Sequence, residues 1–239
     1  AIAVIDAGGV GTLMADDLSP ETLHAQIVQV KKAVGDDTPL VVNVMMTHQG
    51  KDAQIEQLIK DKPAAVSFGN GYVTSDIVEK LHKAGILVIQ LVGTVQGAKA
   101  LVDKKVDLVI AERNYGPGHI SRDKGSEPEQ LIRALRQELY DADIPVIAGG
   151  GFVSADDVAD AFHWGTSAVQ LDDVIAYSGE STYLGKEIVR AVREPPVQGE
   201  GERPLVVEIT DEDDKPIRVL NTPGAEKVAG ELSALRARG

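Results

Sequence analysis

The sequence of 239 residues contains no cysteine, which excludes disulfide bonds, thiolate metal sites and a cysteine nucleophile. Only 4% of the residues are aromatic, so aliphatic side chains must build the core. Basic residues are also few, because 24 Lys and Arg stand against 37 Asp and Glu, for a formal net charge of −13. A surface of this sign repels DNA, RNA and anionic lipid, so we expect neither nucleic acid nor a membrane as a partner.

Long apolar runs are missing as well, and no segment has the length and apolarity to span a bilayer. The first residues, Ala1–Asp6, lack the basic flank and the length of a signal peptide. Nothing points to secretion, and we expect a cytoplasmic protein. The chain length suits one barrel or one doubly wound domain, with a core that needs no metal or disulfide.

One pattern repeats along the chain: a short β-branched apolar run, then Gly, Asn or Asp, then an amphipathic helical stretch. Strands are expected at 11–15, 39–46, 64–69, 86–93, 107–112, 144–149 and 167–171. Helices are expected at 19–34, 74–85, 94–104, from 127 onwards, at 154–165 and at 181–192. Nearly continuous apolar strands that alternate with helices predict a parallel sheet covered by helices, as in a (β/α)8 barrel of TIM type.

The two ends of the chain differ from this repeat. Ala1–Asp6 is either a strand or the end of a helix, and seven residues are too few to decide by periodicity. The runs 205–210 and 217–220 flank an acidic turn, which predicts a hairpin, and 225–238 predicts a closing helix. We therefore expect a parallel β/α barrel over 1–193, and a linker, hairpin and closing helix packed on it over 194–239.

Three consecutive glycines, Gly149, Gly150 and Gly151, directly follow an expected strand. Their backbone N–H groups favour a phosphate, and the helix that begins near Ser154 adds its N-terminus; the alternative is a tight strand-to-helix turn. The next strand ends with Asp172 and Asp173. Two acids there repel a phosphate unless they point away, and they are equally consistent with a solvated loop.

A histidine and three amides complete the candidates. His119 lies on a Gly-rich stretch after the 107–112 strand and is either a general base or an exposed loop histidine. Asn43, Gln90 and Gln170 interrupt apolar strands, and three amides in one barrel mouth would suit a planar heteroaromatic ligand. His48 is a weaker candidate, and the helical histidines His24, His82 and His163 favour surface roles. No cluster has the spacing of metal ligands, so no metal site is expected.

Taken in order, these segments resemble a known family. They are Asp6-Ala-Gly-Gly-Val-Gly-Thr12, Ser19-Pro-Glu21, Val42-Asn-Val44, Val66-Ser-Phe-Gly-Asn-Gly71, Gly118-His119, Ala148-Gly-Gly-Gly151 and Val169-Gln170. Their order and spacing are similar to those of the nitronate monooxygenases, and the FMN-dependent enoyl-acyl-carrier-protein reductases share much of this order. The resemblance covers nearly the whole chain.

The resemblance implies a TIM barrel with FMN at the carboxyl ends of its strands. It places Asn43, Gln90, Gly149, Gly150, Gly151 and Gln170 around FMN. His119 would be the base that takes the α-proton of a nitroalkane, while the flavin carries the redox chemistry. The departures are Asp172 and Asp173 in place of Gly-Thr, and Ala1 inside the first helix, so that the barrel lacks its first strand or gains it from elsewhere. An open edge favours pairing with a second copy or a partner chain.

These features predict an FMN-dependent oxidoreductase that oxidises a nitroalkane, a nitronate or a similar small acidic carbon substrate. One alternative is an FMN-dependent enoyl-thioester reductase that uses a nicotinamide cofactor. The other, from a different class, is a non-catalytic barrel subunit that has lost its flavin site, for which Asp172 and Asp173 are the evidence.

Overall fold

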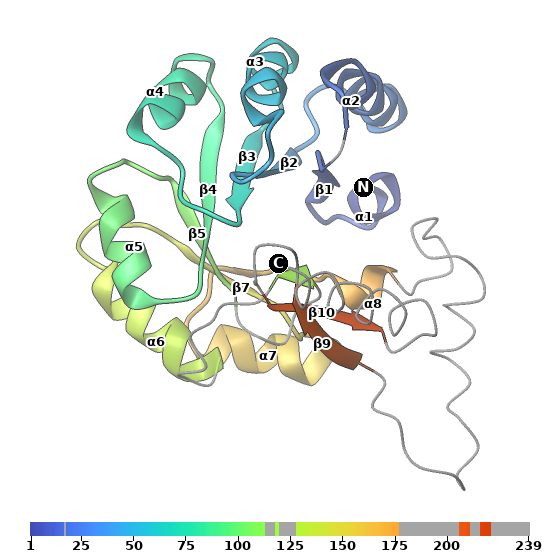
Figure 1. Ribbon diagram of the computed structural model, residues 1–239. Coiled ribbons are helices and arrows are strands. Elements are labelled where there is room, and N and C mark those ends of the chain that lie inside the picture. The colour runs from blue at the N-terminus through green and yellow to red at the C-terminus, as the bar shows by residue number, and fades with distance from the viewer. Residues whose placement is uncertain (17, 113–117, 120–127, 177–205, 211–215, 221–239) are drawn as a thin grey trace, which may run out of the picture.

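In the computed structural model, seven parallel strands form one curled sheet with helices around its outer face (Figure 1). The structure describes residues 1–16, 18–112, 118–119, 128–176, 206–210 and 216–220. The strands are β1 (Gly11–Met14), β2 (Leu40–Met45), β3 (Ala65–Gly69), β4 (Leu87–Val92), β5 (Leu108–Glu112), β7 (Val146–Gly149) and β8 (Ala168–Val169). They pair in the order β1-β2-β3-β4-β5-β7-β8, which confirms the predicted parallel β/α barrel type.

The sheet is open within the described residues, because β1 and β8 are its two edges. The ambiguous first segment is a helix, α1 (Ile2–Asp6), which precedes β1. Pairing of this open edge with another chain stays a prediction. None of the helices in the described ranges has the length and apolar character of a membrane span.

The remaining helices alternate with the strands. They are α2 (Pro20–Val34), α3 (Lys51–Asp61), α4 (Ser75–Lys83), α5 (Val95–Val102), α6 (Pro128–Glu138), α7 (Ala155–His163) and α8 (Asp173–Ala176). Sequence analysis missed α3, whose buried positions are only Gln54, Ile55 and Leu58. The expected helices 181–192 and 225–238 lie outside the described residues.

Two helix starts form as their sequences predict. Ser19 accepts a hydrogen bond from the Thr22 N–H at 3.2 Å, and Pro20 occupies the first helical position. At α7, Ser154 and Asp157 form a reciprocal capping box, in which each side chain binds the backbone N–H of the other. The capping box fixes where the chain leaves the loop after β7.

The core has two layers, one on each face of the sheet. The larger layer packs helix residues such as Leu23, Leu81 and Leu135 against strand residues such as Phe68, which is fully buried. The smaller layer contains strand residues only: Val41, Ala65, Ile89 and Ile110, with Leu91, Leu108 and Ile147 partly buried against them. Because side chains alternate along a strand, this second layer is the concave inner face, away from the helices.

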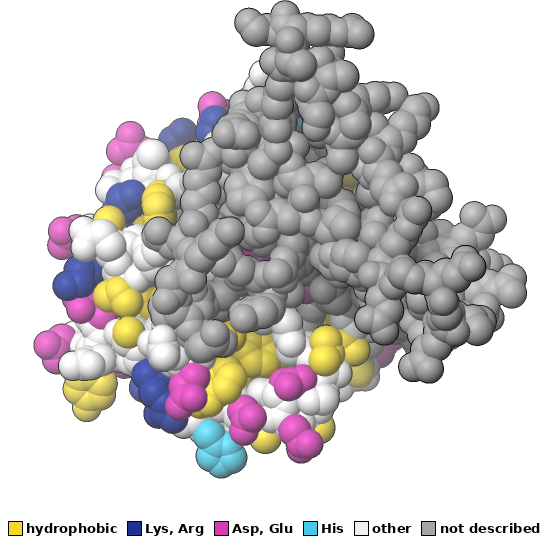
Figure 2. All heavy atoms as spheres, turned by 60° about the horizontal axis from the view of Figure 1, so that its bottom comes forward, with side chains coloured by type: hydrophobic (Ala, Val, Ile, Leu, Met, Phe, Trp, Pro, Cys, Tyr) yellow, Lys and Arg dark blue, Asp and Glu magenta, His cyan; other side chains and the backbone are white. Residues whose placement is uncertain are grey.

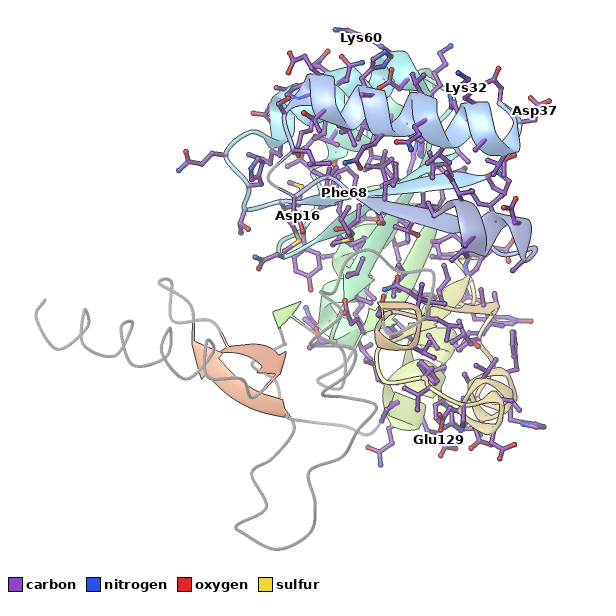
Figure 3. All side chains as sticks on the ribbon, turned by 90° about the vertical axis from the view of Figure 1, so that its right-hand side faces the viewer. Asp16, Lys32, Asp37, Lys60, Phe68 and Glu129 are labelled. Carbon is purple, nitrogen blue, oxygen red and sulfur yellow. The ribbon has the colours of Figure 1, made fainter. Side chains whose placement is uncertain are left out.

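A second, antiparallel sheet contains β6 (Gly118–His119), β10 (Pro216–Leu220) and β9 (Val206–Thr210), in that order. β9 and β10 are the predicted hairpin strands. Figure 3 shows this sheet on the side of Asp16, which follows β1, and opposite Asp37, which precedes β2. The small sheet therefore lies toward the carboxyl ends of the parallel strands. The division of the chain at residue 193 stays a prediction.

Figure 2 shows the side of the molecule that carries α6 and α7. On the described part of this face, acidic and basic side chains are interspersed with apolar ones. Exposed apolar residues of the described chain include Tyr140, which follows α6, and Phe162 in α7. Single apolar side chains among charges are ordinary for a protein surface and indicate no binding site by themselves.

Candidate active site

The carboxyl ends of β5, β7 and β8 meet at one place on the inner face. Glu112 ends β5 and is paired in register with Gly149, which ends β7. The Cβ of Gln170, just after β8, would lie 3.9 Å from a Cβ built on Gly149. Glu112 follows Ile110 by two residues and therefore faces the same inner side. The carboxyl side chain of Glu112, the glycine at 149 and the amide side chain of Gln170 thus lie next to one another at the carboxyl ends of the strands.

The glycine triplet has a backbone that other residues would strain. Gly150 and Gly151 have φ values of 83° and 82°, in the left-handed region. Among the described residues, no hydrogen bond has the backbone N–H of Gly150 or Gly151 as its donor. Successive N–H groups of this kind form a concave donor site for an anion. This geometry is consistent with both alternatives, a tight strand-to-helix turn and an anion site at these two N–H groups.

A side chain at Gly149 is excluded for a steric reason. A Cβ built there would lie 2.7 Å from Cγ2 of Ile110, well inside normal contact distance. Glycine is therefore the residue that fits at position 149 without displacing Ile110.

Two carboxyl groups lie beside the triplet. Burial, and to a lesser extent the neighbouring carboxyl of Asp172, raises the pKa of Glu112 from 4.5 to about 7. Burial also raises the pKa of Asp172, against the opposite effect of a hydrogen bond from Gln170. That bond joins Gln170 Nε2 to Asp172 Oδ1 at 2.9 Å. Glu112 is therefore partly protonated near neutral pH.

Asn43 lies deeper on the same inner face. Its Nδ2 donates to Oγ of Ser67 at 3.0 Å, and its side chain is buried. Gly69 ends the neighbouring strand, and a Cβ built on Gly69 would lie 4.0 Å from Asn43 Nδ2. The same Cβ would lie 3.4 Å from Sδ of Met45 and 3.6 Å from Cδ2 of Leu91, so side chains of both neighbouring strands border this space.

Gln90 is not brought together with Asn43. It lies between Ile89 and Leu91, both of the inner layer, so its side chain points to the helix-covered face. Its Oε1 accepts from the Val73 N–H at 2.9 Å, and its Nε2 donates to the carbonyl oxygens of Phe68, Gly71 and Leu91. The expectation of three amides that converge in one mouth is therefore not met, because Gln90 instead holds the loop after β3.

His119 lies in strand β6 rather than on an unpaired glycine-rich loop. Its backbone pairs with Ile217 of β10, a partner that sequence analysis did not identify. The small sheet places His119 on the carboxyl side of the barrel (Figure 3). The weaker candidate His48 accepts a hydrogen bond from the Gly50 N–H through Nδ1 at 3.1 Å, so it has a local structural role at the start of α3.

Two other histidines, His24 and His82, form ion pairs away from the carboxyl ends of the strands. His24 pairs with Asp61 at 2.7 Å, and His82 pairs with Asp107 at 2.8 Å, both on the outer side. Within the described ranges, no group of three or more His, Asp or Glu side chains is arranged to hold a metal ion.

Glu112 was not among the residues predicted from the sequence, and the structure pairs it in register with Gly149. The sequence did contain a signal, because Glu112 ends an apolar strand two residues after Ile110 and must face the same side. The burial of Glu112 and its proximity to Asp172 depend on tertiary structure.

Comparison with known proteins identifies the family. The sequence profile described as nitronate monooxygenase matches residues 45–231. The chain belongs to the nitronate monooxygenase family. It is 26% identical over 143 residues to the nitronate monooxygenase of Pseudomonas aeruginosa, with 59% of this chain and 41% of that protein aligned.

Two further proteins are similar to this chain over nearly its whole length. The (3aS,4S,5R,7aS)-5-hydroxy-7a-methyl-1-oxo-octahydro-1H-indene-4-carboxyl-CoA dehydrogenase of Mycobacterium tuberculosis is 27% identical over 237 residues, 99% of this chain and 62% of that protein. The structure of FabK from Thermotoga maritima matches with a TM-score of 0.83 and 26% identity, over 96% of this chain and 69% of that chain. The chain spans less than two thirds of either curated relative.

Proposed function

We propose that this member of the nitronate monooxygenase family binds FMN at the carboxyl ends of its parallel strands and serves as a flavin-dependent oxidoreductase. The observation that carries the proposal is the pair of neighbouring N–H donors at Gly150 and Gly151, which suits a phosphate. The inner-face mouth next to them, with Asn43 and Gln170, would take the ring system. Gln90 would act by holding the loop after β3.

The chemistry divides between the cofactor and the chain. Bound FMN supplies the redox capacity that no side chain has. The protein binds the phosphate through Gly149–Gly151 and excludes water with the inner apolar layer of Val41, Ala65, Ile89 and Ile110. His119, on the carboxyl side of the barrel, would take the α-proton of a nitroalkane or a similar small acidic carbon substrate.

A second candidate substrate is a thioester. The M. tuberculosis relative, which aligns with 99% of this chain, is named as a dehydrogenase of a carboxyl-CoA compound. A thioester also acidifies its α-carbon, so the same base and flavin would serve. Oxidation of NAD(P)H that depends on an added enoyl thioester would distinguish a reductase of this class from a nitroalkane-oxidising enzyme.

The first test is the visible spectrum of the purified protein, before and after addition of FMN. We expect flavin absorption that remains after gel filtration. The variant Gly151→Ala should weaken FMN binding by roughly tenfold or more, because the Cβ strains the left-handed backbone and displaces an N–H donor.

The matched control is Gly85→Ala. Gly85 also has a left-handed φ, 78°, but nothing lies within 4 Å of a Cβ built there, and it lies in the turn between α4 and β4, at the amino end of the sheet. It carries the same backbone strain away from the site, so FMN binding should be unchanged. A colourless protein that takes up no FMN would refute the proposal and favour a non-catalytic barrel.

A further inference from the structure

The carboxyl pair at the barrel mouth has no place in the binding scheme described so far. Glu112 faces Gly149 across paired strands, and Asp172 binds the amide of Gln170. Among the described residues, the half-buried Glu112 carboxyl accepts no hydrogen bond and forms no ion pair. A carboxylate that is partly removed from water and has no compensating donor or cation is costly when ionised.

An anion at the glycine triplet makes this cost larger. A phosphate held by the N–H groups of Gly150 and Gly151 would lie next to Gly149, with which Glu112 is paired in register, and above the apolar inner layer that includes Ile110. Like charges in such surroundings favour the neutral form of the weaker acid. A bound phosphate and a fully ionised pair are therefore mutually unfavourable.

We propose that the pair formed by Glu112 and Asp172 takes up one proton from solvent when the phosphate of FMN binds, so that affinity for FMN falls as the pH rises above neutrality. The inference rests on the proposed function, because it assigns a regulatory property to the same site. Glu112 is the better proton acceptor of the two, since it lacks the hydrogen bond that Asp172 accepts from Gln170.

Among the described residues of the elements around Glu112, no Lys or Arg side chain pairs with its carboxyl group. The neighbouring strands β4 and β7 contain no charged residue. The charged side chains of α6, which packs against β5, form ion pairs elsewhere: Arg133 with Glu129 and Glu138 with Lys99 of α5. Arg136 lies against Gly165, which precedes β8, at the opposite end of the sheet. Asp172 is therefore the described charge that acts on Glu112.

The test is a fluorescence titration of the purified apoprotein with FMN at pH 6 and at pH 8. If the free protein titrates near pH 7 and the complex stays protonated, linkage predicts that the Kd rises roughly tenfold across this range. Glu112→Gln should abolish the rise, and its affinity should stay level or improve, since a phosphate gains its second charge near pH 6. Asp141→Asn, which removes an exposed carboxyl in the turn before β7, should keep the wild-type dependence.

Riboflavin and calorimetry complete the experiment. Riboflavin lacks the phosphate, so its affinity should not change with pH in either protein. Calorimetry of FMN binding to the wild type at pH 7.5, in two buffers of different ionisation enthalpy, should report uptake of most of one proton and needs no variant. Asp172→Asn serves as a second variant and should reduce the pH dependence.

The experiment distinguishes failure of FMN binding from failure of the proton-uptake proposal. If neither the wild type nor Glu112→Gln binds FMN at any pH, the proposed function is wrong. If FMN binds with the same pH dependence in both, or calorimetry reports no proton uptake, the carboxyl pair is not the acceptor and this inference alone is overturned.

Discussion

Replacement of Gln90 by methionine should destabilise the protein by about 3 kcal/mol, although methionine has nearly the same length. The amide of Gln90 accepts from the Val73 N–H and donates to the carbonyl oxygens of Phe68 and Gly71. Val73 and Phe68 are fully buried, so water cannot replace the lost partners. A buried donor left without an acceptor costs about 1–3 kcal/mol, and the two carbonyl groups add to this.

For a chain of this size, the loss corresponds to a fall in Tm of roughly 6–12 °C. Thermal unfolding followed by circular dichroism measures it, and hydrogen exchange at the Val73 amide should accelerate at the same time. The control is Gln29→Met on the exposed side of α2, where the expected change is within about 0.5 kcal/mol. Equal Tm values for Gln90→Met and the wild type would show that these hydrogen bonds do not hold the loop.

Two other variants test the charges at the site. Because the folded protein holds the pKa of Glu112 at about 7, above the unfolded value of 4.5, its folding stability should fall as the pH rises between these two values. Glu112→Gln should remove this loss and be more stable than the wild type at pH 8 by about 3 kcal/mol in urea unfolding, and a wild type that is equally stable at pH 5 and pH 8 would contradict this. His119→Asn should lower turnover of a nitroalkane by at least about a hundredfold while the flavin spectrum is retained. His163→Asn, on the last turn of α7, should not, and unchanged turnover in the first variant would remove His119 from the mechanism.

Much of the fold was predictable because local and tertiary signals agree. Strands such as Leu40–Met45 are apolar on both faces, and starts such as Ser19-Pro20 have few alternatives to a helix N-terminus. Helix α3 was missed because it buries a glutamine, Gln54, whose amide donates to the carbonyl oxygens of Ala15 and Leu18. This glutamine side chain binds backbone groups of the loop after β1. Its polar character at a buried position weakens the apolar periodicity by which a helix is predicted.

The neighbours of the candidate site residues were only partly predictable from the sequence. The three glycines at a strand end predicted where backbone donors would gather, and the structure places Gly149 beside Gln170. The direction of Gln90 depends on its register in β4, and the role of Glu112 depends on burial that only the assembled sheet provides. Sequence identifies a residue type at a strand end, but neighbours from other strands set its protonation.

The proposed roles are divided between two sheets. The parallel sheet would carry the proposed phosphate site, whereas His119 belongs to β6, whose partner β10 comes almost a hundred residues later in the sequence. Changes in the hairpin can therefore reposition the base without disturbing the strands that would retain the cofactor. Such an arrangement lets evolution exchange one substrate for another on an unchanged barrel.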